Sequence, residues 1–354
     1  MPTCPGIEHL SMTVPDLDEA TRFFTGVFGC RVLYTMGPFD GSGGAFMRVY
    51  ANADVRTVVR YVRVLRSPYL NIELFQVDSP VQRARWPDRH DIGGWSPSAH
   101  VDDMAAAVAW LEQADVYLLG EERPAGGRAA DGGSARCSFM TRWGLHVDLV
   151  TRPDDGDGTA GVTHLRNRAA AGAGFTPEGG LPSFQGFTAV GMTVPDLDAA
   201  TNLLVAVLGC ESIADIGPPR NETGSAFGAS ANVDVRAAPG GGRRLRTPFL
   251  DLELSECPPY PGQERAWPGI LDVGGWHLAV YVDDVDAALD HLAGLDVRVL
   301  GGKKPAYDFE AGDDACTVHC LAPFGFSFEL VTYPHGRYRA SDFAGPAWHP
   351  GHPG

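Results

Sequence analysis

Apolar and polar positions follow the same plan in four segments that lie far apart in the chain. The segments Gly6–Phe24 and Gly186–Leu204 are 180 positions apart and share the seven residues MTVPDLD. Each starts with a pattern that predicts a strand and continues, after Val-Pro-Asp, with apolar residues three and four apart, which predict an amphipathic helix. The segments His100–Leu111 and Tyr281–Leu292 follow the same plan. The pattern therefore predicts four strand-to-helix units.

An aspartate marks the start of each predicted helix. A carboxylate at this place can accept hydrogen bonds from first-turn amides, which indicates a cap rather than a catalytic acid. The four caps are Asp16, Asp103, Asp196 and Asp284. After each helix come glycine-punctuated stretches rich in Val, Tyr, Phe and Leu, and then a closing strand that carries an acid. The unit is βαβββ, repeated four times, so we predict an α+β fold of four modules.

The order of the repeats predicts two halves. Modules 1 and 2 form the expected N-terminal domain, residues 1–152, and modules 3 and 4 form the expected C-terminal domain, residues 186–335. Residues 153–185 are rich in Gly, Ala and Asp with little periodicity, which is typical of a linker. Residues 336–354 are expected to be a tail.

Composition narrows the class of partner. The chain has 354 residues, 44% of them hydrophobic, which is enough for two domains with sizeable cores. Its formal charge of −16 would repel phosphate backbones and anionic membranes, so we expect a small-molecule partner rather than nucleic acid or a membrane. Without a long apolar run or a signal-peptide pattern, we expect a cytoplasmic protein. The seven cysteines include no CxxC pair, which indicates buried thiols rather than disulfides.

Equivalent positions of the four modules carry different side chains where chemistry is expected. The residue seven places before each helix-start aspartate lies on the opening strand, and these residues are His9, Ser96, Ala189 and His277. Each closing strand carries one acid flanked by large apolar residues, and these acids are Glu73, Asp148, Glu253 and Glu329. Because neighbouring strand residues point to opposite faces, the acids face the enclosed side of the sheet. A charge there needs a metal, a cation or a hydrogen-bond donor.

The motifs HLSMTVPDLDEATRFFTGVFG, GGWHLAVYVDD, IELF and FELV resemble the vicinal oxygen chelate superfamily, which includes glyoxalases, bleomycin-resistance proteins and extradiol dioxygenases. The resemblance covers nearly the whole chain except the linker, the tail and glycine-rich loops. It implies that modules pair into two cup-shaped mixed sheets with helices outside. It also implies that a metal is held by the opening-strand residue and the closing-strand acid of each module in a pair. One fold here hosts several reactions, so the fold does not select among them.

The side chains at these positions distinguish two ways of pairing the modules. If sequence neighbours pair, each cup contains one histidine and makes a poor metal site. If module 1 pairs with module 4, and module 2 with module 3, the first cup collects His9, Glu73, His277 and Glu329. The second cup then collects Ser96, Asp148, Ala189 and Glu253. We therefore expect the crossed pairing, in which Ala189 marks a cup that has lost its metal site.

The expected cofactor is one divalent ion, Zn, Ni, Fe, Mn or Co. Two imidazoles and two carboxylates suit such borderline metals and leave positions for water or substrate. The alternative is that His9 and His277 are ordinary core histidines, and their joint placement counts against it. No catalytic metal is expected in the second cup, where His100 could mark a vestigial site. His146 is expected to point away from Asp148.

Strand alternation also nominates side chains that line the first cup. They are Ser11, Thr13, Asn71, Phe75, Ala279 and Ser327. Tyr281 lies on the same predicted face as His277, where its phenol could donate or relay a proton. It could equally be a large residue that fills the cup, and both interpretations are open.

The resemblance implies a substrate bound through two adjacent oxygens, with the ion polarising a carbonyl. Glu73 and Glu329 belong to different modules, so one could remove the proton beside that carbonyl and the other could return it on the opposite face. The expected activity is therefore that of a glyoxalase-like or epimerase-like isomerase, or of a lyase, with Glu73, Glu329 and Tyr281 as candidate catalytic residues.

Two other functions remain open. Without Glu73, the residues His9, His277 and Glu329 form the two-histidine, one-carboxylate arrangement of an Fe(II) extradiol-type dioxygenase that cleaves a catechol or hydroquinone. A metal-free protein that binds a drug and confers resistance is the third possibility, and the two histidines count against it. Both cups can be completed within one chain, so a monomer or a homodimer is expected.

Overall fold

The computed structural model describes most of the repeated modules and part of the segments around them. The described residues are 5–39, 54, 56–124, 135–151, 175, 177–216, 241–305, 315–334 and 347–350. Of the expected linker 153–185, residue 175 and residues 177–185 fall within this set. Of the expected tail 336–354, residues 347–350 do.

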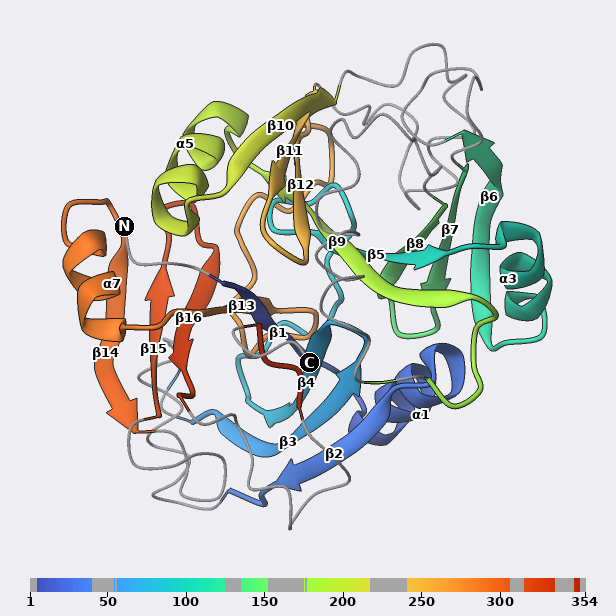
Figure 1. Ribbon diagram of the computed structural model, residues 1–354, viewed down its shortest axis with the longest axis horizontal. Coiled ribbons are helices and arrows are strands. Elements are labelled where there is room, and N and C mark those ends of the chain that lie inside the picture. Colours follow the sequence, from blue (N-terminus) through green and yellow to red (C-terminus); the bar gives the residue numbers. More distant parts are fainter. Residues whose placement is uncertain are drawn as a thin grey trace. The chain divides into compact units, whose positions relative to one another are not determined.

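One mixed eight-stranded sheet is formed by the first and last modules (Figure 1), with the strand order β14-β15-β16-β13-β1-β4-β3-β2. Module 1 contributes β1 (Gly6–Thr13), α1 (Leu17–Phe28), β2 (Arg31–Met36), β3 (Val58–Ser67) and β4 (Leu70–Asp78). Module 4 contributes β13 (Trp276–Tyr281), α7 (Val285–Leu292), β14 (Arg298–Pro305), β15 (Cys316–Leu321) and β16 (Ser327–Thr332). Helices α1 and α7 pack against this sheet.

The second mixed eight-stranded sheet is formed by the two middle modules, in the order β10-β11-β12-β9-β5-β8-β7-β6. Module 2 contributes β5 (Trp95–Val101), α3 (Met104–Leu111), β6 (Val116–Pro124), β7 (Ala135–Thr141) and β8 (His146–Val150). Module 3 contributes β9 (Phe184–Val194), α5 (Leu197–Leu208), β10 (Glu211–Ile216), β11 (Gly241–Arg246) and β12 (Asp251–Glu256). Helices α3 and α5 pack against this sheet, which confirms the α+β class.

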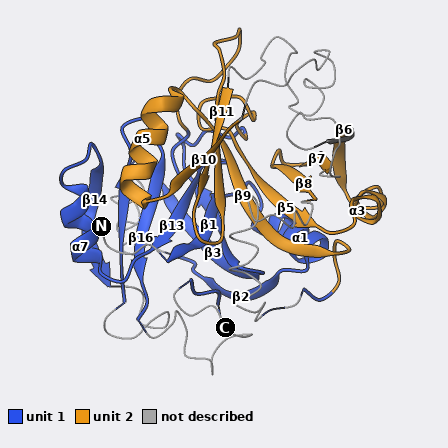
Figure 2. Ribbon diagram, turned by 45° about the horizontal axis from the view of Figure 1, so that its top comes forward, with its two compact units in different colours: residues 1–85, 171–178, 268–354 blue, residues 86–170, 179–267 orange. Residues whose placement is uncertain are grey.

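The opening strands join the modules in the crossed arrangement. Strand β1 pairs antiparallel with β13 of module 4, and β5 pairs antiparallel with β9 of module 3. The two compact units are residues 1–85, 171–178 and 268–354, and residues 86–170 and 179–267 (Figure 2). These units cut across the sequential halves 1–152 and 186–335, because strand pairing decides which modules share a core.

The predicted caps define where each helix begins. Each of the four side chains accepts a hydrogen bond from the backbone N–H three residues further on, at 2.7 to 3.0 Å, and the caps are Asp16, Asp103, Asp196 and Asp284. Helices α1 and α5 end at Gly29 and Gly209, both with φ of 63°. Glycine suits this left-handed conformation because it has no Cβ. The capping bonds therefore define the start of all four helices, and the two glycines define the ends of α1 and α5.

The opening strands of the first unit are buried along their whole length, as every residue of β1 and β13 is. On β1, apolar Leu10 and Met12 alternate with His9 and Ser11, so the two faces of the strand differ in polarity. The polar face is where the predicted ligands lie. Among the described residues, no helix is long and apolar enough to cross a membrane.

Candidate metal centre

The central strands of the first unit bring the predicted ligands together. Ser11, in the middle of β1, lies opposite His277 on β13 and opposite Glu73 on β4. His9 lies two residues before Ser11 and therefore on the same face of β1. Strand pairing between the first and last modules thus joins side chains from opposite ends of the chain.

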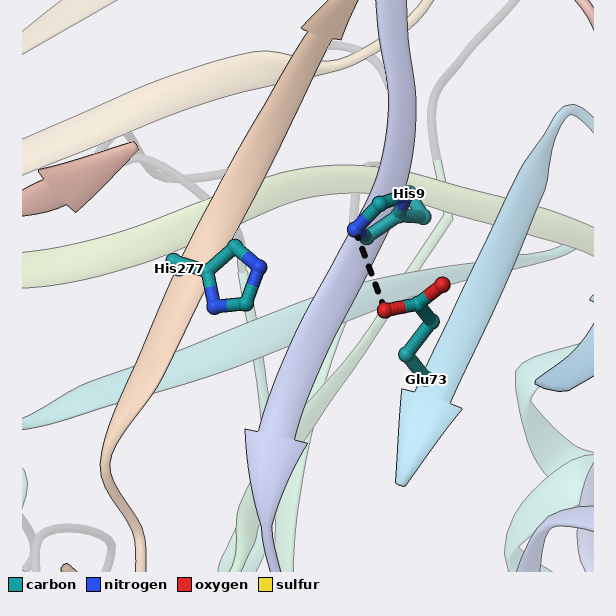
Figure 3. A group of neighbouring side chains, drawn as sticks. All are labelled: His9, Glu73 and His277. Atoms are coloured by element: carbon teal, nitrogen blue, oxygen red, sulfur yellow. Dashed lines mark ion pairs between the residues drawn. The ribbon is translucent and has the colours of Figure 1, made fainter. Parts of the chain in front are cut away.

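The distances define a compact group of nitrogen and oxygen donors. His9, Glu73 and His277 each offer one ligand atom within 4.8 Å of the others (Figure 3). His9 Nε2 lies 3.3 Å from Glu73 Oε2 and 3.5 Å from Glu329 Oε2. His277 Nε2 lies 3.9 Å from the same Glu329 oxygen. Glu329 is outside the mutually close trio, yet it lies within 4 Å of both histidines.

Burial and charge at this site favour a cation. Each of the four side chains is buried, from His9 at 1% exposed to Glu329 at 7%. Burial raises the pKa of Glu329, opposed by His9 and assisted by the charge of Glu73. Burial also lowers the pKa of His277 well below its usual range. Neutral imidazole nitrogens beside two converging carboxylates are a donor set for a divalent ion, so these residues fit the metal that the resemblance implies.

A third histidine faces the site from β15. His319 lies opposite Glu329 in the antiparallel pair of β15 and β16, with its Nε2 3.3 Å from Glu329 Oε1. Its ring meets that of His277 edge to face, with centroids 5.2 Å apart. Lys304 on β14 is 8% exposed, and its charge acts on both histidines and on Glu329. Neither residue was predicted; the available signal for His319 was its place across a hairpin from the ligand acid.

The residue before His9 is a carboxylate with no exposed surface. A register shift between Ile7 and His9 in the pair of β1 and β13 marks a bulge at Glu8. Glu8 Oε2 makes a short contact with His9 Nδ1, and Asn71 Nδ2 donates to Glu8 Oε1 at 2.6 Å. Glu8 was not predicted either. The signal in the sequence was a charged residue next to a candidate ligand within a segment predicted to be a strand.

Three of the predicted lining residues adjoin the candidate ligands. The ring of Phe75 meets that of His277 edge to face, with centroids 6.2 Å apart. Ser11 has no exposed surface and lies between the ligand strands. Ala279 lies opposite His9 in the pair of β1 and β13.

The other three lining residues make hydrogen bonds with the surrounding backbone. Thr13 Oγ1 donates to the carbonyl of Ile270 at 2.7 Å. Ser327 Oγ donates to a backbone carbonyl of β15 at 3.4 Å. Asn71 bonds to the backbone of Trp348 as well as to Glu8. A lining role for these residues stays a prediction.

Tyr281 lies in an apolar cluster with Val331 and Tyr333, and it is 4% exposed. Its ring meets that of His349 edge to face, with centroids 4.5 Å apart. Burial raises the pKa of the phenol, opposed by a hydrogen bond with Thr332. This packing is what a cup-filling residue requires, and a catalytic role for Tyr281 stays a prediction.

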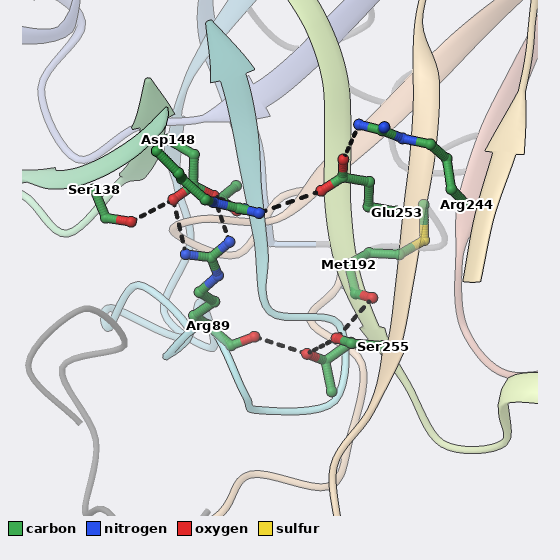
Figure 4. Close-up of polar contacts among 10 residues, drawn as sticks. Arg89, Ser138, Asp148, Met192, Arg244, Glu253 and Ser255 are labelled. Atoms are coloured by element: carbon green, nitrogen blue, oxygen red, sulfur yellow. Dashed lines mark hydrogen bonds and ion pairs between the residues drawn. The ribbon is translucent and has the colours of Figure 1, made fainter. Parts of the chain in front are cut away.

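In the second unit, arginine side chains lie against the closing-strand acids (Figure 4). Arg89 Nη1 donates to Asp148 Oδ1 at 3.0 Å, and Arg136 Nη2 donates to Asp148 Oδ2 at 2.5 Å. Ser138 Oγ also donates to this carboxylate, at 2.5 Å. Burial alone would raise the pKa of Asp148, but the two guanidinium groups hold it well below its usual range.

The same network reaches the second acid. Arg136 Nη1 lies 3.8 Å from Glu253 Oε2, and Arg244 donates to the other oxygen of Glu253. Arg244 stands opposite Glu253 on the neighbouring strand, at the register where His319 stands opposite Glu329. Guanidinium groups therefore contact the acids of this unit, whereas imidazoles contact those of the first.

The histidines of the second unit correct one prediction. His146 lies two residues before Asp148 on β8, so both side chains share a face and the expectation that they point apart was wrong. The charges of Arg89 and Asp148 both act on the pKa of His146. His100 Nε2 lies 3.8 Å from Asp102, and a vestigial site there stays a prediction.

The chain is similar in sequence to known proteins. The family model of the Glyoxalase/Bleomycin resistance protein/Dioxygenase superfamily matches residues 8–135 and 189–317. A 2-epi-5-epi-valiolone epimerase from an Actinomyces species is 34% identical over 155 residues, which are 43% of this chain and 82% of that protein. This similarity supports an enzyme of the superfamily.

Two solved structures show the likeness of fold. Glyoxalase I from Zea mays has a TM-score of 0.56 and 15% identity, and the match covers 92% of each chain. A putative dioxygenase from Bacillus subtilis has a TM-score of 0.55 and 18% identity, with 95% of this chain and 87% of that chain covered. Because the two family-model matches together span more than half of the 354 residues, the chain belongs to the glyoxalase/bleomycin resistance protein/dioxygenase superfamily.

Proposed function

We propose that the first unit is a divalent-metal-dependent epimerase or isomerase that moves a proton beside the carbonyl of a small hydroxy ketone. The observation that carries this proposal is the convergence of two carboxylates from different modules on one histidine. Glu73 and Glu329 lie 3.3 and 3.5 Å from His9 Nε2. Acids that approach from two sides are what removal and return of a proton on opposite faces require.

The ion would be held by His9, Glu73, His277 and Glu329. When bound, it supplies positive charge that polarises the carbonyl and stabilises the anion left when the proton departs. The burial of these side chains excludes bulk water, which strengthens the charge interactions within the site.

The two glutamates have different surroundings and take different parts in the proposal. His319 contacts Oε1 of Glu329, which holds this carboxyl with Oε2 towards the ligand histidines. Glu73 lies opposite Val64 on β3. In the proposal one of these glutamates takes the proton from one face of the substrate, and the other returns a proton to the opposite face.

The similarity to 2-epi-5-epi-valiolone epimerase supports epimerisation over cleavage, and it makes 2-epi-5-epi-valiolone the first compound to test. The two chains are 34% identical over 43% of this one, so a related hydroxy ketone is an equally suitable second substrate. An isomerase of this kind needs no oxidant and no second substrate.

The test is to incubate the metal-loaded protein with 2-epi-5-epi-valiolone in D₂O and to follow the substrate by NMR. We expect the epimer to form with deuterium at the inverted carbon. Glu73→Gln and Glu329→Gln should each lower the rate by at least about 100-fold, since a general base or acid contributes about 10²- to 10⁴-fold. Glu253→Gln, which changes the equivalent acid of the second unit, is the matched control. Equal activity of all three variants would remove the assignment to the first unit.

A ring-cleaving dioxygenase is the second candidate, favoured by one observation. The three mutually close donors are His9, His277 and Glu73, two histidines and one carboxylate, which is the ligand type of Fe(II) oxygenases. The carboxylate of this trio is Glu73, whereas the sequence-based expectation for a dioxygenase was Glu329. Oxygen uptake by the Fe(II)-loaded protein with a catechol or hydroquinone, without deuterium exchange into hydroxy ketones, would place this candidate first.

A further inference from the structure

Glu8 is a carboxylate in a place where the fold does not call for one. It has no exposed surface, and a buried charge is costly unless it is paired. The same place in the other three modules, eight residues before the helix-start aspartate, holds Trp95, Thr188 and Trp276. An acid is therefore not needed to build this strand, which suggests a role tied to the neighbouring ligand.

The contacts of Glu8 specify that role. An ionised Glu8 can only accept hydrogen bonds, and in that state His9 Nδ1, which contacts Glu8 Oε2, carries the ring proton. The lone pair of the imidazole is then on Nε2, the atom that faces Glu73 and Glu329. A carboxylate behind a histidine commonly fixes the tautomer and ring orientation of a metal ligand in this way.

Asn71 connects Glu8 to the C-terminal part of the chain. Its Nδ2 donates to Glu8 Oε1 at 2.6 Å and to the carbonyl of Trp348 at 2.8 Å. Its Oδ1 accepts from the Trp348 N–H at 2.9 Å. The side-chain amide is therefore held by the backbone of one residue on both of its polar atoms. The orientation that suits Trp348 is the one that also serves Glu8.

The segment around Trp348 is docked by several further contacts within the first unit. Trp348 is 1% exposed, its ring meets that of Tyr69 edge to face at 5.5 Å, and the Arg66 guanidinium lies 5.3 Å from its ring centroid. His349 Nε2 lies 3.0 Å from the carbonyl of Tyr333. These contacts tie the segment to β3, to the turn between β3 and β4, and to the residue that follows β16.

We propose that the C-terminal segment 347–350 is part of the support of the metal centre. In this arrangement Trp348 orients Asn71, Asn71 orients Glu8, and Glu8 holds His9 in the tautomer that presents Nε2 to the ion. Asn71 and Glu8 are positioning residues, and the inference rests on the proposed metal site.

The first test measures Zn²⁺ affinity by competition with a chelator on the full chain. Glu8→Gln and Asn71→Ala should each weaken Zn²⁺ binding by about 10- to 100-fold, the usual effect of losing such a supporting contact. Thr57→Ala is the matched control, because Thr57 is also buried in this unit but its hydroxyl pairs with Ser79 at 2.8 Å. Glu8→Gln preserves the volume of the side chain, so its Zn²⁺ affinity still tests the proposal if Asn71→Ala does not fold.

The second test uses the reciprocity of linked equilibria, since a segment that supports Zn²⁺ binding must in turn be stabilised by Zn²⁺. Hydrogen exchange at the Trp348 amide should slow when Zn²⁺ is added to the wild type, and this slowing should be lost in Glu8→Gln. The capped amide of Glu19 on α1 should exchange at the same rate with and without Zn²⁺.

The outcomes separate the inference from the proposed function. Two results would overturn the role of the C-terminal segment alone. In the first, the wild type binds Zn²⁺ and Glu8→Gln binds it within about two-fold as tightly. In the second, the wild type binds Zn²⁺ and the hydrogen-exchange rate of the Trp348 amide does not change. A wild type that binds no divalent ion overturns the metal centre and this role together.

Discussion

Single side chains at equivalent positions of the modules differ between the two units. At the opening-strand position the first unit has His9 and His277, and the second has Ser96 and Ala189. The acids of the closing strands are present in both units, so the difference between the units lies in their partners. Imidazoles contact the acids of the first unit, and guanidinium groups contact those of the second. A guanidinium carries a fixed positive charge, so it can satisfy a buried acid without a metal.

The metal content of histidine variants tests this difference. We expect the wild type, purified without added metal, to hold about one divalent ion per chain, and His9→Ala and His277→Ala to hold less than about one tenth of that, because each removes a principal donor. His100→Ala, in the second unit, should keep the wild-type content. Elemental analysis of the three variants gives the answer, and retention of the ion in both ligand variants would refute the site.

The second unit should lose stability in mild acid. Burial, assisted by the charge of Arg89, lowers the pKa of His90 to about 3 and that of His146 to about 4. Both groups ionise near 6.5 in an unfolded chain, so between pH 6.5 and about 4 the unfolded state binds protons that the folded state does not. The contribution of these two histidines to the free energy of unfolding should be constant well above pH 6.5 and fall by up to about 1.4 kcal/mol per pH unit and per histidine below it.

Urea unfolding at several pH values measures this slope. His146→Gln should remove the share of one histidine between pH 6 and 4.5. An unaltered slope in His146→Gln would show that this histidine titrates alike in both states.

The four described helices begin in the same way but end differently. All four begin at a capping aspartate, yet their ends differ: α1 and α5 stop at Gly29 and Gly209 in the left-handed conformation, whereas α3 and α7 end at right-handed Glu112 and Ala293. The capping contact is local, because the side chain bonds to an amide three residues away. It therefore follows from sequence alone, whatever the strand beside it carries.

Removing one cap should have a small and measurable cost. Asp284→Ala deletes the acceptor for the Ala287 N–H at 3.0 Å and should lower the free energy of unfolding by about 1 kcal/mol. Asp290→Ala removes an equal charge from an exposed position of the same helix and should change it by less than about 0.5 kcal/mol. Denaturant unfolding of the two variants compares them directly, and equal effects would mean that the charge, not the cap, matters.

The first unit is assembled from two distant parts of the chain. The first unit needs β1 and β4 from one end and β13 and β16 from the other, since β1 is paired on one side by β4 and on the other by β13. Most of the second unit lies between these two parts in sequence, and its eight strands pair only with one another. One chain therefore has a candidate metal site in the first unit and arginine-paired acids in the second unit, each within its own sheet.

Dividing the chain should separate the ligands. A fragment of residues 1–152 contains His9 and Glu73 but lacks β13 and β16, so we expect it to bind Zn²⁺ at least about 100-fold more weakly than the full chain. Mixing it with residues 153–354 should restore binding, because the second fragment supplies His277 and Glu329. Titration with Zn²⁺ measures both states, and full-strength binding by the first fragment alone would contradict the crossed arrangement.

Local pattern was sufficient for the modules, the caps and the candidate donors. Strand alternation and helix capping depend on neighbours two to four residues apart, so the repeats predict βαβββ units and place His9, Glu73, His277 and Glu329 at equivalent points. The resemblance and the sharing of two histidines then predicted which modules pair, and the sheets confirmed it.

Contacts across strands could not be derived in this way. His319 contacts Glu329 because the two residues lie opposite each other in a hairpin. Glu8 lies at a bulge in the pair of β1 and β13, next to His9. Asn71 bonds to Trp348 because the C-terminal segment packs beside β4. In the second unit, Arg136 reaches acids on two different strands. Each depends on registers and loop paths that bring distant residues together, and a period of two along one strand carries no information about its neighbours. The sequence alone thus determined the modules and their donors, and the tertiary structure decided what surrounds those donors.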